Sequence, residues 1–65
     1  MKKISENTYE YKIYKNHKEQ EFKIIENPDI YDIYHMNGTF GVWKCGKAVS
    51  LENCKEVIMR YLKKI

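Results

Sequence analysis

The most informative part of the sequence is residues 8–24, TYEYKIYKNHKEQEFKI, in which two alternating runs flank a polar pair. Side chains at every second position of such a run lie on the same face of a strand. If Asn16-His17 forms a two-residue loop, Tyr11 lies opposite Phe22 and the apolar positions of both runs share one face. The segment therefore predicts a β-hairpin with a well-specified register. The same register pairs opposite charges on the other face: Lys12 with Glu21 and Glu10 with Lys23.

A second hairpin is expected around Asn37-Gly38, after a turn at Asn27-Pro28-Asp29. Asn-Gly favours a type I′ turn because both central residues need a positive φ. Two further strands, residues 30–36 and 39–45, would then flank this turn. The register that follows places Tyr34 opposite Gly41, Ile33 opposite Val42 and Asp32 opposite Trp43.

The last part of the chain has the pattern of an amphipathic helix. Ser50 is well placed as the N-cap, and the helix is expected to run from Leu51 to about Lys64. Its apolar stripe consists of Leu51, Cys54, Val57, Ile58, Tyr61, Leu62 and Ile65. The sequence thus predicts an α+β fold, a four-stranded antiparallel β-meander followed by one C-terminal helix packed on one face. Residues 1–7 show no periodicity and are expected to form a flexible N-terminus, and residues 8–65 a single small domain.

Length and composition exclude several classes of protein. A chain of 65 residues holds one small core and no large enzyme scaffold. The net charge is +3, and the basic residues are 11 Lys and a single Arg, a mild and undiagnostic excess. No apolar run is long enough to span a membrane, and two cysteines are too few for a disulfide framework. We therefore expect a cytoplasmic, intracellular protein without a membrane partner.

No catalytic constellation stands out, so we expect the protein not to be an enzyme. In the Asn-Gly register, Cys45 and His35 lie five positions apart and on opposite faces, which separates a thiol nucleophile from its base. His17 and His35 lie at the tips of different hairpins and lack the close spacing of metal ligands. We expect no cofactor and no metal.

One helix covers only one face of a four-stranded sheet, which leaves the other face for solvent or a partner. Because an unpaired Asp32 is costly to bury, we expect Ile33, Phe40 and Val42 under the helix. The predicted partner-binding residues on the open face are Tyr34, Trp43, Met36, Asp32, Lys12 and Lys23. The alternatives are that these side chains merely cover their own sheet, or that Trp43 and Tyr34 belong to the core.

The leading functional hypothesis is a non-enzymatic module that binds another protein through its open sheet face or a sheet edge. Its small size and its enrichment in Lys, Ile, Asn and Tyr, residue types that AT-rich codons encode, suggest an accessory or inhibitor protein of a phage or mobile element, acting on a host or defence protein. One alternative is a small nucleic-acid-binding protein that uses the sheet aromatics and lysines. Another is a structural homodimer formed through uncovered faces or edges.

Overall fold

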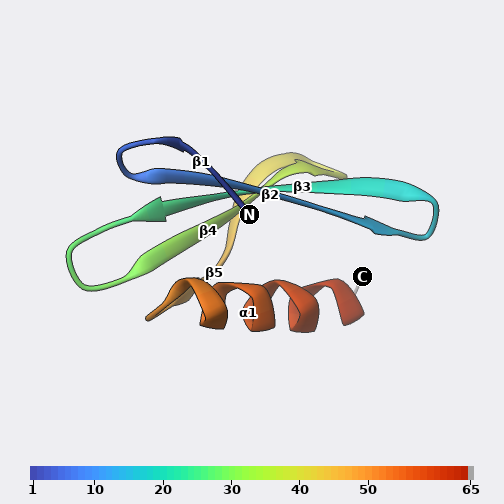
Figure 1. Cartoon of the computed structure of the whole chain (residues 1–65). Coiled ribbons are helices and arrows are strands. Elements are labelled where there is room, and N and C mark those ends of the chain that lie inside the picture. Colours follow the sequence, from blue (N-terminus) through green and yellow to red (C-terminus); the bar gives the residue numbers. More distant parts are fainter. Residues whose placement is uncertain (65) are drawn as a thin grey trace.

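A computed structural model describes residues 1–64 as a five-stranded antiparallel sheet followed by one helix, which confirms the predicted α+β class (Figure 1). The strands lie side by side in chain order, and the helix α1 runs along one face of the sheet. The elements are β1 (Lys2–Ser5), β2 (Thr8–Lys15), β3 (Lys18–Glu26), β4 (Tyr31–Gly38), β5 (Gly41–Ala48) and α1 (Leu51–Lys63).

The additional strand, β1, comes from residues expected to be an unstructured terminus. Lys3 pairs with Tyr9 of β2, and its ammonium lies 5.7 Å from the centre of the Tyr9 ring. The backbone of Asn7 also accepts a hydrogen bond from Glu26 N at 2.7 Å. The strand was missed because its side chains are all exposed, so its sequence carries no apolar alternation.

The β2–β3 hairpin has the predicted register throughout. Tyr11 pairs with Phe22, Lys12 with Glu21, and Lys15 with Lys18 at the closing pair. The loop residues Asn16 and His17 have φ values of 54° and 64°, as a type I′ turn requires. The charged pairs align by backbone as predicted, but the ammonium of Lys12 lies 3.9 Å from Glu10 on its own strand.

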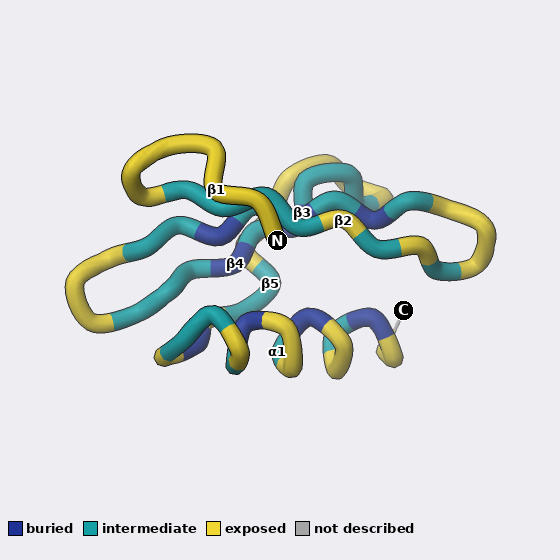
Figure 2. The backbone as a smooth tube through the Cα atoms, viewed as in Figure 1, coloured by how far each residue is buried: buried dark blue, intermediate teal, exposed yellow. Residues whose placement is uncertain are grey.

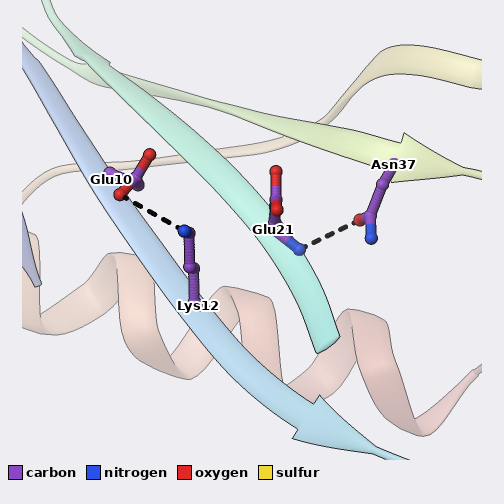
Figure 3. A network of polar contacts seen from close by, with 4 residues as sticks. All are labelled: Glu10, Lys12, Glu21 and Asn37. Carbon is purple, nitrogen blue, oxygen red and sulfur yellow. Dashed lines mark hydrogen bonds and ion pairs between the residues drawn. The ribbon is translucent and has the colours of Figure 1, made fainter. Parts of the chain in front are cut away.

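The β4–β5 hairpin differs from the prediction, because the turn lies at Thr39-Phe40 and not at Asn37-Gly38. Gly38 pairs with Gly41, whose φ of 95° matches the glycine that follows the turn in a G1-bulge hairpin. The Asn37 side chain is used elsewhere: its Oδ1 accepts a hydrogen bond from Glu21 N at 3.0 Å (Figure 3). Its Nδ2 donates a hydrogen bond to Glu19 O at 2.7 Å. The amide thereby continues the pairing of β4 with β3.

The displaced turn changes which residues of β5 face the helix. Trp43 pairs with His35, not with Asp32, and two bulges interrupt the ladder. Phe40 and Val42 were expected beneath the helix and are instead exposed. Ile33 is fully buried as expected.

The core lies between α1 and the central strands. Figure 2 shows buried positions on β3 and β4, and on α1 along the side of the helix nearest the sheet. The fully or nearly fully buried apolar side chains are Phe22, Ile24, Ile33, Ala48, Cys54, Ile58 and Leu62. Ser50 caps α1 as predicted, with its hydroxyl accepting from Asn53 N at 3.1 Å. Ile65, the last residue of the expected apolar stripe, lies outside the described residues.

Candidate functional site

The β4–β5 hairpin carries the densest group of exposed apolar side chains near a cavity. Phe40 is fully exposed at the turn, Val42 is 59% exposed and Trp43 is 54% exposed. We call these three residues the hairpin-tip surface. Large exposed aromatic side chains are costly to leave in water and are enriched at protein interfaces.

A cavity of about 380 Å³ opens between this hairpin and α1. Aromatic rings from both elements form its walls: Phe40 and Trp43 from the hairpin, and Tyr61 from the helix. His35, Gly38 and Thr39 complete the lining. We refer to it as the aromatic cavity. Its volume lies within the range of about 300–1,000 Å³ that small-ligand sites occupy.

A chain of hydrogen bonds holds the wall of this cavity in place. Trp43 Nε1 donates to the Tyr61 hydroxyl at 3.1 Å, and the same hydroxyl lies 2.7 Å from His35 Nδ1. On the other side of the ring, His35 Nε2 lies 2.8 Å from Gln20 Oε1. Because an amide oxygen only accepts, Nε2 carries the imidazole proton, and Nδ1 accepts from the Tyr61 hydroxyl.

The pKa shifts of His35 and Tyr61 both favour the uncharged forms that make these hydrogen bonds. Burial lowers the pKa of His35, and the positive charge of Lys18 lowers it further, so the imidazole is neutral at pH 7. Burial also raises the pKa of Tyr61, which keeps its hydroxyl protonated and able to donate. His35 was expected at the tip of its hairpin but is only 2% exposed, because the turn lies two residues further along the chain and the imidazole packs against Phe22 and Tyr61.

A second, more polar cavity of about 270 Å³ adjoins the first. The two share His35, Gly38 and Thr39 in their linings. The remaining lining residues come from the β2–β3 hairpin and from β4: Lys15, Asn16, Lys18, Gln20 and Asn37. We refer to it as the lysine cavity. Two lysines and no carboxylate line it, so it presents positive charge to a ligand.

The predicted open-face residues divide into two groups. Tyr34 pairs with Lys23 on one side and with Lys44 on the other, and the ammonium of Lys44 lies 2.8 Å from Asp32. Tyr34, Asp32 and Lys23 come together as predicted, with Lys12 further along the sheet and Met36 on the face of Tyr34 by strand alternation. Lys44 joins them because the register of β5 is displaced. Trp43 does not belong with them. Its hydrogen bond to Tyr61 places it on the helix side, and the expectation of an open-face indole was wrong.

The open face therefore carries fewer aromatic side chains than expected, and the charge of Asp32 is paired. Asp32 accepts from Asn27 Nδ2 at 2.7 Å as well as pairing with Lys44. The Asp32 carboxylate raises the pKa of Lys44, so the ion pair persists at neutral pH. Without the indole, Tyr34 is the aromatic side chain at the centre of this face.

Cys45 lies closer to His35 than the predicted Asn-Gly register placed it. In the observed register Cys45 lies two residues beyond Trp43, the partner of His35, and it packs against the core on the helix side. Burial raises the pKa of the Cys45 thiol to about 11, and that of Cys54 to about 11. Both thiols are therefore protonated at neutral pH and are weak nucleophiles. Within residues 1–64, no group of three or more His, Cys, Asp or Glu side chains is arranged to hold a metal ion.

Comparison with known proteins identifies no relative: the chain matches no protein-family model, no curated protein and no solved structure. Among residues 1–64, there is no helix whose length and apolar character would let it cross a membrane.

Proposed function

We propose that the protein is a non-enzymatic binding module that docks on another protein through the hairpin-tip surface, Phe40, Val42 and Trp43. One observation carries the proposal: a fully exposed phenylalanine lies at the turn of a hairpin beside a half-exposed tryptophan. Burying a phenylalanine side chain stabilises a complex by about 1.5–3 kcal/mol, and Trp is the residue type most enriched at interface hot spots.

The indole is also held in place before any partner arrives. Its ring lies 5.7 Å from the ring of Tyr61, and its N–H is bound to the Tyr61 hydroxyl. A side chain fixed in advance loses less conformational entropy when it is buried in an interface. Trp43 is therefore suited to act as an anchor, with Phe40 beside it.

The position of β5 adds a second source of affinity. It forms one edge of the sheet, and its first four residues, 41–44, are all exposed. An edge strand presents backbone N–H and C=O groups to which an extended segment of a partner can add.

We place the protein in the cytoplasm because a chain with two cysteines has no disulfide framework.

The experiment is affinity capture from a lysate of the cells that make the protein, with photo-crosslinking to locate the contact. A photoreactive phenylalanine analogue at position 42 should crosslink to the captured protein, and Phe40→Ala and Trp43→Ala should each lose the capture. Tyr14→Ala is the matched control, because Tyr14 is an aromatic residue of intermediate exposure between Trp43 and Phe40 and lies away from this hairpin. Capture that survives both hairpin substitutions but is lost in Tyr34→Ala would contradict the proposal and place the interface on the open sheet face.

Nucleic-acid binding and homodimerisation remain as predictions to be tested beside this one. The geometry gives less support to nucleic acid, because Lys12 and Lys44 each lie within 4.0 Å of a carboxylate oxygen and Trp43 lies on the opposite face. Binding to nucleic acid would weaken steeply with salt, and Lys23→Gln would reduce that slope. A homodimer would have twice the monomer mass at micromolar concentration.

A further inference from the structure

The two adjoining cavities differ in chemistry in a way that suggests one ligand. The aromatic cavity offers ring faces and edges from three elements of the chain: the turn, β5 and α1. The lysine cavity offers two ammonium groups together with amide and hydroxyl groups from Asn16 and Thr39. A ligand that spans both therefore needs a flat apolar part and an anionic part.

The two lysines have no evident structural reason to be neighbours. Lys15 and Lys18 are paired directly across the β2–β3 hairpin. Like charges at directly opposed positions destabilise a hairpin. Within residues 1–64, neither ammonium lies within 4.0 Å of a carboxylate oxygen. An anion bound between them would remove this repulsion.

The positive charge of Lys18 also acts on His35, a residue that lines both cavities. Lys18 lowers the pKa of His35, after the larger effect of burial, so its charge acts on the imidazole that lines both spaces. The imidazole itself is neutral and is held by Tyr61 and Gln20. The anionic part of a ligand is therefore expected at the lysines and the uncharged part against the aromatic rings.

We propose that these cavities together bind an aryl phosphate, with the ring between Phe40, Trp43 and Tyr61 and the phosphate between Lys15 and Lys18. Lysine is a common phosphate ligand, and two ammonium groups match the charge of a phosphate monoester. Aromatic side chains bind a flat ring by offset stacking and edge contacts. The inference rests on the proposed function, since Phe40 and Trp43 also form the hairpin-tip surface and a docked protein would present the aryl phosphate as a phosphotyrosine side chain.

The first test uses phenyl phosphate as the probe and Trp43 as the reporter, because it is the single tryptophan of the chain. Phenyl phosphate should change the indole fluorescence in a saturable way. Phenol, which lacks the charge, should bind at least about tenfold more weakly, since a charge-assisted contact is worth about 1.4 kcal/mol or more. Inorganic phosphate should compete with phenyl phosphate. No saturable change at millimolar concentrations of phenyl phosphate would overturn the proposal.

Substitutions at the lysines separate binding from folding. Lys15→Gln and Lys18→Gln should each weaken phenyl phosphate binding about tenfold while leaving phenol unaffected. Each should also raise the melting temperature slightly, because the cross-hairpin repulsion is removed. Lys12→Gln, on the same strand as Lys15 but on the opposite face, is the control and should leave binding unchanged. Unchanged affinity in the Lys15→Gln/Lys18→Gln double variant would contradict the phosphate position.

Two further ligands distinguish the sources of an aryl phosphate. A phosphotyrosine peptide that binds more tightly than phenyl phosphate supports a protein-borne group, and the unphosphorylated peptide is its control. A nucleoside monophosphate that binds more tightly would instead assign the site to a free nucleotide. If partner capture depends on Phe40 but phenyl phosphate does not bind, the ligand assignment fails and the docking proposal stands. If phenyl phosphate binds and capture is unchanged in Phe40→Ala, the docking proposal fails alone.

Discussion

Replacing Tyr61 with phenylalanine removes one oxygen and tests the network that fixes the aromatic cavity. The hydroxyl of Tyr61 is the donor to His35 Nδ1 and the acceptor from Trp43 Nε1. The ring itself stays in place, with the T-shaped contact to Phe22 at 6.0 Å between centroids. The variant therefore isolates the hydrogen bonds from the packing.

The expected cost comes mainly from the histidine side of the network. His35 is only 2% exposed, so loss of the Tyr61 hydroxyl leaves its buried Nδ1 without its hydrogen-bond partner, which costs about 1–3 kcal/mol. The indole N–H belongs to a half-exposed side chain and can bind water at little cost. We therefore predict a loss of about 1–3 kcal/mol in the free energy of unfolding, or about 4–8 °C in melting temperature per kcal/mol for a domain of this size.

Urea and thermal denaturation followed by circular dichroism measure this loss, and NMR titration of His35 provides a second readout. Without the donor from Tyr61 the neutral imidazole is less stabilised, so the pKa of His35 should rise from its lowered value. Tyr14→Phe is the control, because the exposed Tyr14 hydroxyl has no hydrogen-bond partner within residues 1–64, and it should change stability by less than about 0.5 kcal/mol. A Tyr61→Phe variant as stable as the wild type, with an unchanged His35 titration, would refute the proposed network.

Three further substitutions or conditions test other parts of the fold. Gly46→Ala places a Cβ 2.7 Å from Val57 Cγ1, so it should destabilise the domain by about 1–3 kcal/mol, and Val57→Ala in the same chain should recover part of that loss in a double-mutant cycle. Ser50→Ala removes the N-cap of α1 and should cost about 1 kcal/mol by chemical denaturation, whereas Ser50→Asp should cost less than half of that. The pKa of His35 is lowered by burial and by Lys18, so the unfolded chain binds a proton that the folded chain does not. Stability should therefore fall as the pH drops below the unfolded value of about 6.5, with a slope of at most about 1.4 kcal/mol per pH unit, and a melting temperature that is flat from pH 7 to pH 5.5 would contradict this.

The elements with local signals could be predicted from the sequence. The β2–β3 register followed from the agreement of its apolar face, its charged face and its two-residue loop. The helix followed from the N-cap at Ser50 and the apolar stripe behind it. In both segments a shift of one residue would have moved apolar side chains into water, so a single arrangement satisfied every pattern.

The β4–β5 hairpin could not be predicted in the same way, because two glycines near its turn and apolar residues on both faces allow more than one register. The Asn37 side chain is needed to pair with the backbone of β3, a contact between distant segments that no local pattern reveals. Gly38 is favoured by close approach, since a Cβ there would lie 3.1 Å from Gly41 O, and Gly41 is favoured by its φ of 95°. A glycine following the Thr39-Phe40 pair was the available signal, and it favours a turn with a G1 bulge.

This difference in register explains why the predicted site was only partly recovered. The open-face residues other than Trp43 kept their positions, because the β2–β3 register was predicted correctly and the alternation of side chains along β4 does not depend on where the following turn lies. Phe40 is exposed at the turn instead of lying beneath the helix, and Trp43 lies on the helix side instead of the open face. Both differences arise because the turn lies at Thr39-Phe40 and the bulges change the alternation of β5. Tyr61 was expected only in the apolar stripe of the helix, and its hydrogen bonds to Trp43 and His35 depend on the observed register.

Both proposed sites depend on the register of the β4–β5 hairpin, and a NOESY spectrum of the labelled protein measures it directly. The structure predicts cross-strand contacts between His35 and Trp43 and between Tyr34 and Lys44. It also predicts a contact from the indole N–H of Trp43 to the ring of Tyr61. Cross-strand contacts between Asp32 and Trp43, with no contact from the indole to the helix, would contradict the account and return the tryptophan to the open face.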